Sequence, residues 1–150
     1  MTINIENLSV SFNTAGKQIN AIDNISFAIK GGETFALLGE SGCGKSLTAS
    51  AIIQLLPKNA YCHKASNIFF KGDNLLSLSE SEMRLYRGKK IAMIFQEPMT
   101  SLNPVLSIGE QLAEVLINNE PKLSKENIRT RSVKLLKTVE ILEPEHRIDD

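Results

Sequence analysis

Residues 39–46 read Gly-Glu-Ser-Gly-Cys-Gly-Lys-Ser, which matches the spacing G-x-x-x-x-G-K-[ST]. A short apolar run at 34–38 comes directly before this segment, and a helical pattern from Lys45 to Leu56 follows it and stops at Pro57. A run that is short and continuously apolar is typical of a strand buried on both faces. The order of strand, glycine-rich loop and helix therefore predicts an α/β protein built around this loop.

The chemistry of this loop suits a chain of phosphate groups. Glycines let the backbone curl so that successive N–H groups point inward, and the N-terminus of the following helix adds unpaired N–H groups and a partial positive charge. Lys45 can reach β- and γ-phosphates as a cation, and the Ser46 hydroxyl can ligate Mg²⁺. A chance match is expected about once in 200 chains of this length, so nucleotide binding is the favoured interpretation. The predicted nucleotide-binding residues of the loop are Gly39, Ser41, Gly42, Cys43, Gly44, Lys45 and Ser46.

Composition excludes several other classes of protein. The 150 residues include 17 basic and 17 acidic side chains, so the net charge is zero and no basic excess points to nucleic acid. The longest apolar run, 91–95, is far shorter than the roughly 20 residues of a membrane helix, and the N-terminus has no secretion signal. Cys43 and Cys62 are too few for a disulfide framework and lack zinc spacing. These bounds predict a soluble cytoplasmic protein.

Alternating apolar residues predict two half-buried strands in the first thirty residues. One alternation covers residues 3–12 and slips in phase at Glu6–Asn7, which predicts a bulge, and another covers residues 25–29. Turn residues at 13–17 separate them, so an antiparallel pair is expected. Further strands are expected at 67–70 and, as a second buried strand, at 91–95.

Helical patterns dominate the last third of the chain. Capping boxes at Ser79–Glu82 and Ser107–Glu110 predict helix starts. Apolar residues recur at helical spacing over 108–116 and again over 128–142, with a polar break at 118–124. A separate helical lobe is therefore expected at the end of the chain.

The run Ile91-Ala-Met-Ile-Phe-Gln-Glu-Pro-Met-Thr-Ser-Leu-Asn-Pro104 closely resembles the Q-loop segment of ATP-binding-cassette (ABC) ATPases. Within that family it is similar to the branch that serves oligopeptide, dipeptide, nickel, glutathione and microcin importers, and residues 39–42 and 107–111 fit the same branch. The resemblance implies a P-loop NTPase core with an N-terminal antiparallel β subdomain over residues 1–98. It further implies the start of an α-helical subdomain over residues 99–150.

The resemblance also implies roles for individual residues. Phe12 aligns with the aromatic side chain that stacks on adenine, which gives affinity with little base selectivity. Gln96 aligns with the glutamine that touches Mg²⁺ and the attacking water and begins the hinge to the helical lobe. Ser46 and Gln96 are thus the implied Mg²⁺ contacts, with ATP as the nucleotide. Glu97 is not assigned as the catalytic base, because the family places that glutamate after another strand.

The implied function is that of the ATP-binding subunit of an ABC importer for peptides or related small solutes. Its implied partners are a second ATPase subunit or domain, two transmembrane permease subunits and, indirectly, a solute-binding protein, at the cytoplasmic face of the bacterial inner membrane. Two alternatives remain open: a nucleotide-binding module that never hydrolyses, and an ABC-type ATPase of DNA maintenance. The absence of a long coiled coil and the run at 96–104 favour transport.

The family's later motifs are not found in these 150 residues: a signature motif, a Walker B strand ending in Asp-Glu, a D-loop and a switch histidine. The resemblance therefore predicts an N-terminal fragment truncated before the signature motif, inactive as an ATPase by itself. The family places the Walker B strand between the strands expected at 34–38 and 91–95. Without that strand, both are expected to leave apolar side chains exposed.

Overall fold

The structure is a computed structural model that describes residues 2–96 and 101–150. The chain divides into two compact units, Met1–Met93 and Ile94–Asp150, and each is described here by itself. The predicted boundary between residues 98 and 99 lies outside the described residues, so the division into 1–98 and 99–150 stays a prediction.

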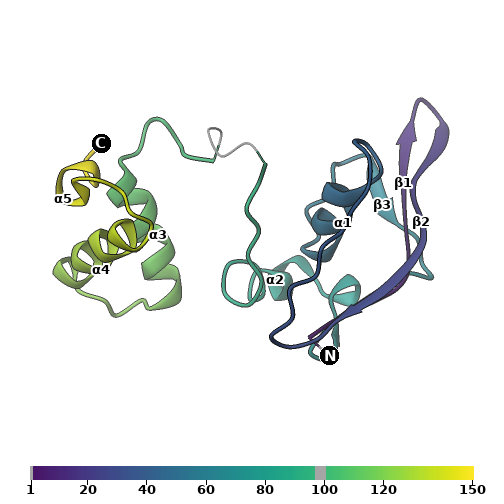
Figure 1. The fold of residues 1–150 in the computed structure, drawn as a ribbon, viewed down its shortest axis with the longest axis horizontal. Coiled ribbons are helices and arrows are strands. Elements are labelled where there is room, and N and C mark those ends of the chain that lie inside the picture. Colours follow the sequence, from purple (N-terminus) through teal and green to yellow (C-terminus); the bar gives the residue numbers. More distant parts are fainter. Residues whose placement is uncertain (1, 97–100) are drawn as a thin grey trace. The chain divides into compact units, whose positions relative to one another are not determined.

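A long antiparallel hairpin forms the frame of the first unit (Figure 1). β1 (Ile3–Thr14) pairs with β2 (Lys17–Ile29), and the two residues between them, Ala15 and Gly16, both have positive φ, 48° and 77°. Left-handed conformations at both central positions are typical of the tight turns that match strand twist. The pairing register shifts between Ile5 and Leu8, where Asn7 has φ 51°, which confirms the predicted bulge.

Three shorter strands complete the antiparallel sheet, whose order is β2-β1-β4-β5 with β3 also paired to β1. β4 (Asn67–Phe70) has the bounds that the sequence predicts. β5 (Asp73–Asn74) returns from it after a two-residue turn, and β3 (Ala60–Cys62) was not predicted.

Short helices pack on this sheet. α1 (Lys45–Ile52) ends four residues earlier than the pattern predicts, and η1 (Leu75–Ser77) precedes α2 (Glu80–Met83), which begins with the predicted capping box. The core of the unit joins side chains of the hairpin, β4, α1 and its C-cap residue, η1, α2 and the turn after α2. Its buried members are Ile5, Leu8, Val10, Ile22, Ala51, Ile53, Ile68, Phe70, Leu75, Met83 and Tyr86.

Residues 34–38 do not form the predicted strand, and the prediction that this segment is buried was wrong. The segment is exposed along its length, with Leu38 90% exposed, although Phe35 stacks on Phe27 with ring centroids 4.9 Å apart. A strand is held by hydrogen bonds to a neighbour, and among the described residues no strand pairs with this segment. Apolar content alone therefore does not make the strand.

The predicted strand at 91–95 is likewise absent. Ile91 makes an isolated parallel bridge to Arg87 and, with Met93, packs on the core, whereas Ile94 is 95% exposed and Phe95 is 50% exposed. The sequence predicts that 34–38 and 91–95 expose apolar side chains when no strand lies between them. This exposure is observed at 34–38 and at 94–95.

The second unit is helical, as the sequence predicts. α3 (Ile108–Asn119), which begins with the predicted capping box, packs against α4 (Lys125–Thr138), and the short α5 (Pro144–Arg147) packs on α4. No helix in the described part of the chain has both the length and the apolar character needed to cross a membrane.

Gly109 allows α3 to approach the end of the chain closely. Its N–H donates to the Ile148 carbonyl at 2.7 Å, and a Cβ at this position would lie 2.9 Å from both Cγ1 and the backbone oxygen of Ile148. We expect Gly109→Ala to lower the free energy of unfolding by about 1–3 kcal/mol because of overpacking, although alanine is otherwise the better helix former. Urea denaturation measures whether Gly109→Ala lowers the free energy of unfolding, with Asn118→Ala, at an exposed position on the same helix, as control. A Gly109→Ala variant more stable than the unmodified chain would contradict the prediction.

Candidate functional site

The glycine-rich loop at 39–44 leads directly into α1. Gly42 and Gly44 have φ of 83° and 93°, which is the left-handed region that side chains other than glycine rarely adopt. Gly44 also lies close against β2: a Cβ on Gly44 would lie 3.1 Å from Ile22 Cγ1 and 3.2 Å from the Ala21 carbonyl oxygen. The curled backbone is therefore seated on the hairpin and has no room for a side chain at Gly44.

We expect Gly44→Ala to destabilise the protein by about 1–3 kcal/mol, because the substitution forces a left-handed residue and a close contact with Ile22 together. Gly31→Ala is the matched control, since Gly31 does not have left-handed φ and its added Cβ would meet only Thr2 Oγ1 at 3.4 Å. The midpoint of urea unfolding measures both variants. Equal midpoints for the two would contradict the assigned strain.

The N-terminus of α1 is open to a ligand. Gly44 is the N-cap residue and no side chain caps the helix. Thr48 turns back on this residue from the first full turn: its N–H and its hydroxyl both donate to the Gly44 carbonyl, at 2.8 Å and 2.9 Å. The first N–H groups of an α-helix lack intrahelical acceptors, so those of Lys45, Ser46 and Leu47 are the donors that an anion at this end would meet.

Lys45 folds back over its own loop. Its Nζ donates to the carbonyl oxygens of Gly39 and Glu40, each at 2.7 Å, and lies 3.4 Å from the Cys43 sulfur. The ammonium thus stands over the glycine-rich backbone. Its predicted contact with β- and γ-phosphates stays a prediction. To contact a phosphate group, it would have to exchange these carbonyl bonds for phosphate oxygens.

Other predicted loop residues are accessible. Ser41 and Ser46 are exposed, and Ser46 lies in the first turn of α1, where a hydroxyl can serve as a ligand for Mg²⁺. Cys43 is a free, exposed thiol, and its N–H points to the Glu40 carbonyl at 3.4 Å. The helix start, the glycine backbone and the lysine together fit a polyphosphate with its metal ion.

Phe12 lies on β1, half-buried, opposite Ile19 of β2 and Ala60 of β3. Alternate residues of a strand share a face, so Phe12 shares its face with Val10. Val10 pairs with Ile22, the residue that contacts Gly44. Phe12 is therefore on the same side of the hairpin as the glycine-rich loop, which is where an aromatic side chain could contact a nucleotide base.

Gln96 lies in the other unit and is exposed. Its predicted contacts with Mg²⁺ and water stay predictions, and Glu97 lies outside the described residues.

Sequence reasoning missed two residues that shape the loop, Ile22 and Thr48. The position of Thr48, two residues after the motif, is the signal that could have indicated a helix-start contact.

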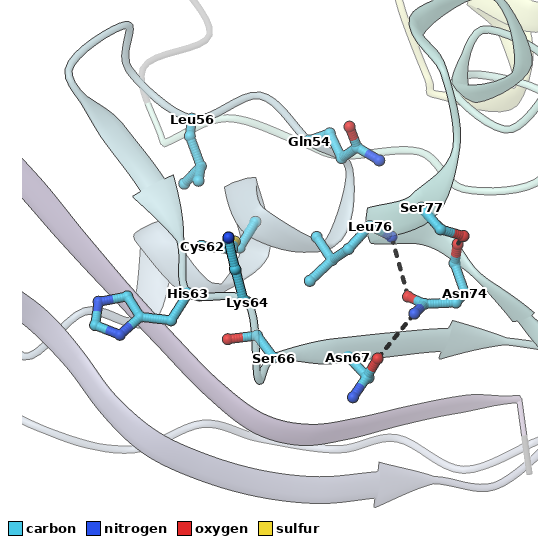
Figure 2. Close-up of a pocket in the computed structure, with 11 residues that line it drawn as sticks. Gln54, Leu56, Cys62, His63, Lys64, Ser66, Asn67, Asn74, Leu76 and Ser77 are labelled. Atoms are coloured by element: carbon cyan, nitrogen blue, oxygen red, sulfur yellow. Dashed lines mark hydrogen bonds between the residues drawn. The ribbon is translucent and has the colours of Figure 1, made fainter.

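A cavity of about 510 Å³ opens elsewhere in the first unit, between the end of α1, the residues after β3 and η1 (Figure 2). The Asn74 amide joins two of its walls: it donates to Asn67 Oδ1 at 2.9 Å and accepts from the Leu76 N–H at 3.2 Å. None of the predicted nucleotide-binding residues lines this cavity. It is therefore separate from the glycine-rich loop.

Known proteins similar to this chain are ATP-binding proteins of transporters. The family model described as "ABC transporter" matches residues 22–149. The chain is 46% identical over 147 residues to the oligopeptide transport ATP-binding protein OppD of Bacillus subtilis, covering 98% of this chain and 41% of that protein. It is 44% identical over 146 residues to the dipeptide transport ATP-binding protein DppD of the same organism, covering 97% and 43%. The chain thus spans about two fifths of the length of these curated relatives.

Solved structures support the fold. A dimeric structure of MJ0796, described as a bacterial ABC transporter cassette, superposes with a TM-score of 0.82 at 26% identity and covers 99% of this chain and 60% of that one. A post-hydrolysis state of the same cassette bound to ADP and Pi gives the same TM-score and identity, covering 98% and 60%. The expected fold class, a mixed α/β ABC ATPase core with an antiparallel subdomain, is confirmed. The chain belongs to the ABC transporter family of ATP-binding proteins.

Proposed function

We propose that this chain is the nucleotide-binding part of an ABC importer ATPase that serves peptides or related small solutes. The observation that carries the proposal is the loop before α1: an uncapped helix start, glycines in left-handed conformation and the Lys45 ammonium over the loop backbone. The names of the Bacillus subtilis relatives support peptide-type solutes.

In this proposal each residue of the loop has a part in holding a triphosphate. The N–H groups from Gly42 to Ser46 bind phosphate oxygens, and Lys45 neutralises charge at the β- and γ-phosphates. The Ser46 hydroxyl holds Mg²⁺, which when bound stabilises charge on the phosphates. Phe12 stacks on the purine. Gln96 orients the attacking water and contacts the metal ion.

The proposed partners follow from the family. A second ATPase subunit or domain, two transmembrane permease subunits and, indirectly, a solute-binding protein would complete the importer. The chain would then be peripheral to the membrane, on its cytoplasmic face. The 17 basic and 17 acidic side chains cancel, so no basic excess favours nucleic acid, and DNA is not a proposed partner.

Titration calorimetry of the complete polypeptide with Mg-ATP tests the proposal. We expect binding in the micromolar to millimolar range, followed by phosphate release. No heat of binding at millimolar Mg-ATP would contradict nucleotide binding and the importer with it. Binding without turnover, even with the permease partners present, would favour the non-hydrolysing module, and turnover stimulated by DNA would favour the maintenance ATPase.

A further inference from the structure

The cavity of Figure 2 has walls that hydrogen bonds within the first unit hold in place. At the end of α1, the Gln54 side chain donates to the Leu75 carbonyl of η1, and the Gln54 carbonyl accepts from Arg87 Nη2 at 3.0 Å. On another wall Ser66 is only 4% exposed, and its hydroxyl accepts a backbone N–H of β1 at 3.0 Å. The cavity is therefore preformed, and its volume of about 510 Å³ is within the range of small-molecule sites.

Three side-chain amides that line the cavity keep donors for a ligand. Gln54, Asn67 and Asn74 each carry two amide N–H donors. Each donates one side-chain hydrogen bond to the described part of the chain: Gln54 to the Leu75 carbonyl, Asn67 to the Ala65 carbonyl and Asn74 to the side chain of Asn67. One N–H of each amide thus remains without a bond to the described residues.

Charge decides which kind of ligand fits. Lys64 lines the cavity, and none of the described ion pairs involves it. None of the described residues that line the cavity is acidic, and His63 can only be neutral or positive. Burial raises the pKa of the Cys62 thiol, so this group adds no negative charge at neutral pH. An anion therefore meets an unlike charge in the cavity, whereas a cation would meet only the lysine.

Part of the wall is apolar. Ala51 is fully buried, Leu56 and Leu76 are half-buried, and all three line the cavity. In Figure 2 the Lys64 side chain lies between those of Leu56 and Leu76. A ligand that joins an anionic group to a short apolar chain can therefore use both kinds of wall, because burial of its apolar surface adds to the attraction of the charge.

We propose that this cavity is a binding site for a small organic carboxylate with a short apolar chain. The carboxylate accepts from the Lys64 ammonium and the remaining amide N–H groups, and the apolar chain lies against Leu56 and Leu76. One lysine matches the single charge of a carboxylate, whereas a phosphate group carries nearly two at neutral pH. This ligand is distinct from ATP, since none of the predicted nucleotide-binding residues lines the cavity. Its binding does not depend on the proposed function, so either can fail alone.

NMR titration of the complete, isotope-labelled polypeptide with isocaproate, without nucleotide, tests this site. We expect saturable shifts of the Gln54, Asn67 and Asn74 side-chain amides, with a dissociation constant in the millimolar range because the ligand is small. Isocaproamide has the same shape without the charge, and inorganic phosphate has charge without the apolar chain. Each of these two probes is expected to bind at least about tenfold more weakly than isocaproate.

A set of matched lysine variants locates the anion. Lys64→Gln removes the charge at an exposed position, where folding does not depend on it, and is expected to weaken isocaproate binding about tenfold. Lys58→Gln is the control, since Lys58 is also exposed but does not line the cavity, and it is expected to leave the affinity unchanged. Lys45→Ala is also expected to bind isocaproate unchanged, because the phosphate loop is separate from this cavity.

Each contrary outcome overturns the proposed site. Absence of saturable shifts at tens of millimolar isocaproate would do so, and it is the result expected if other parts of the complete polypeptide fill the cavity. Equal affinity for isocaproamide would remove the role of charge, and equal affinity for phosphate would remove that of the apolar wall. Undiminished binding in Lys64→Gln would exclude this lysine as the anion's partner. Loss of binding in Lys45→Ala would place the anion on the phosphate loop instead.

Discussion

Lys45→Ala is expected to reduce ATP hydrolysis by the complete polypeptide at least about a hundredfold, since a positioned cation at the transferring phosphate is a major part of transition-state stabilisation. The ammonium already stands over the loop backbone, 2.7 Å from the carbonyl oxygens of Gly39 and Glu40. No other residue of the loop carries a positive charge. Phosphate release measured at saturating Mg-ATP gives the change in kcat, and titration gives the change in affinity.

Lys64→Ala serves as the matched control for Lys45→Ala. Lys64 lines the separate cavity of Figure 2. Its replacement by alanine removes the same charge from the chain as Lys45→Ala does. We expect its kcat to stay within about twofold of the unmodified value. Equal losses in the two variants would mean that net charge, not the phosphate loop, governs the reaction. Unchanged hydrolysis in Lys45→Ala would remove the assignment of residues 39–46 as the ATP site.

The 150-residue chain in isolation is expected to hydrolyse ATP at less than about 1% of the rate of the complete polypeptide, because catalysis needs the nucleophile and the metal ion held from several sides. The same chain is expected to bind an apolar fluorescent dye strongly. Leu38 is 90% exposed, Ile94 is 95% exposed and Leu142 is 82% exposed, and each exposed apolar Å² forgoes about 25 cal/mol of burial. Dye fluorescence and phosphate release, compared between the isolated chain and the complete polypeptide, measure both effects.

A Lys45→Ala version of the isolated chain decides whether any residual activity is genuine. Steady turnover by the 150 residues that disappears in this variant would contradict the prediction, since it would locate a complete catalytic site within them. Turnover that persists in the variant would come from a contaminating ATPase. Weak dye binding would show that the apolar side chains of these runs are shielded from solvent by other contacts.

Elements specified by nearby residues were predictable from the sequence. The antiparallel pair and its bulge at Asn7 follow from side-chain alternation over 3–12 and 25–29, although residues 17–24 of β2 were not predicted. The strand at 67–70 was predicted with its bounds, and β1 is its pairing partner. The capping boxes at Ser79 and Ser107 are local hydrogen-bond patterns, which three or four residues determine. The phosphate loop was predictable for the same reason, since its glycines and lysine act within one short segment.

Elements that depend on distant partners were not predictable. The runs at 34–38 and 91–95 have the composition of buried strands, but strand formation depends on a neighbour that composition does not reveal. α1 ends early because Gln54 takes a left-handed conformation that a non-glycine residue does not signal. Arg87, thirty-three positions further along, holds this end, and no periodicity links two such sites.

The position of the Lys45 ammonium has a consequence for what the loop can distinguish. This cation donates to two backbone oxygens, which compete with any anion at the loop for its hydrogen bonds. The apparent affinity of the loop for an anion then depends on the difference in free energy between two states of the Lys45 side chain, one bound to the carbonyls and one bound to the anion. If the loop holds ATP as proposed, the triphosphate has to outcompete both carbonyls for the Lys45 ammonium, and an anion of lower charge gains less Coulomb energy with which to do so.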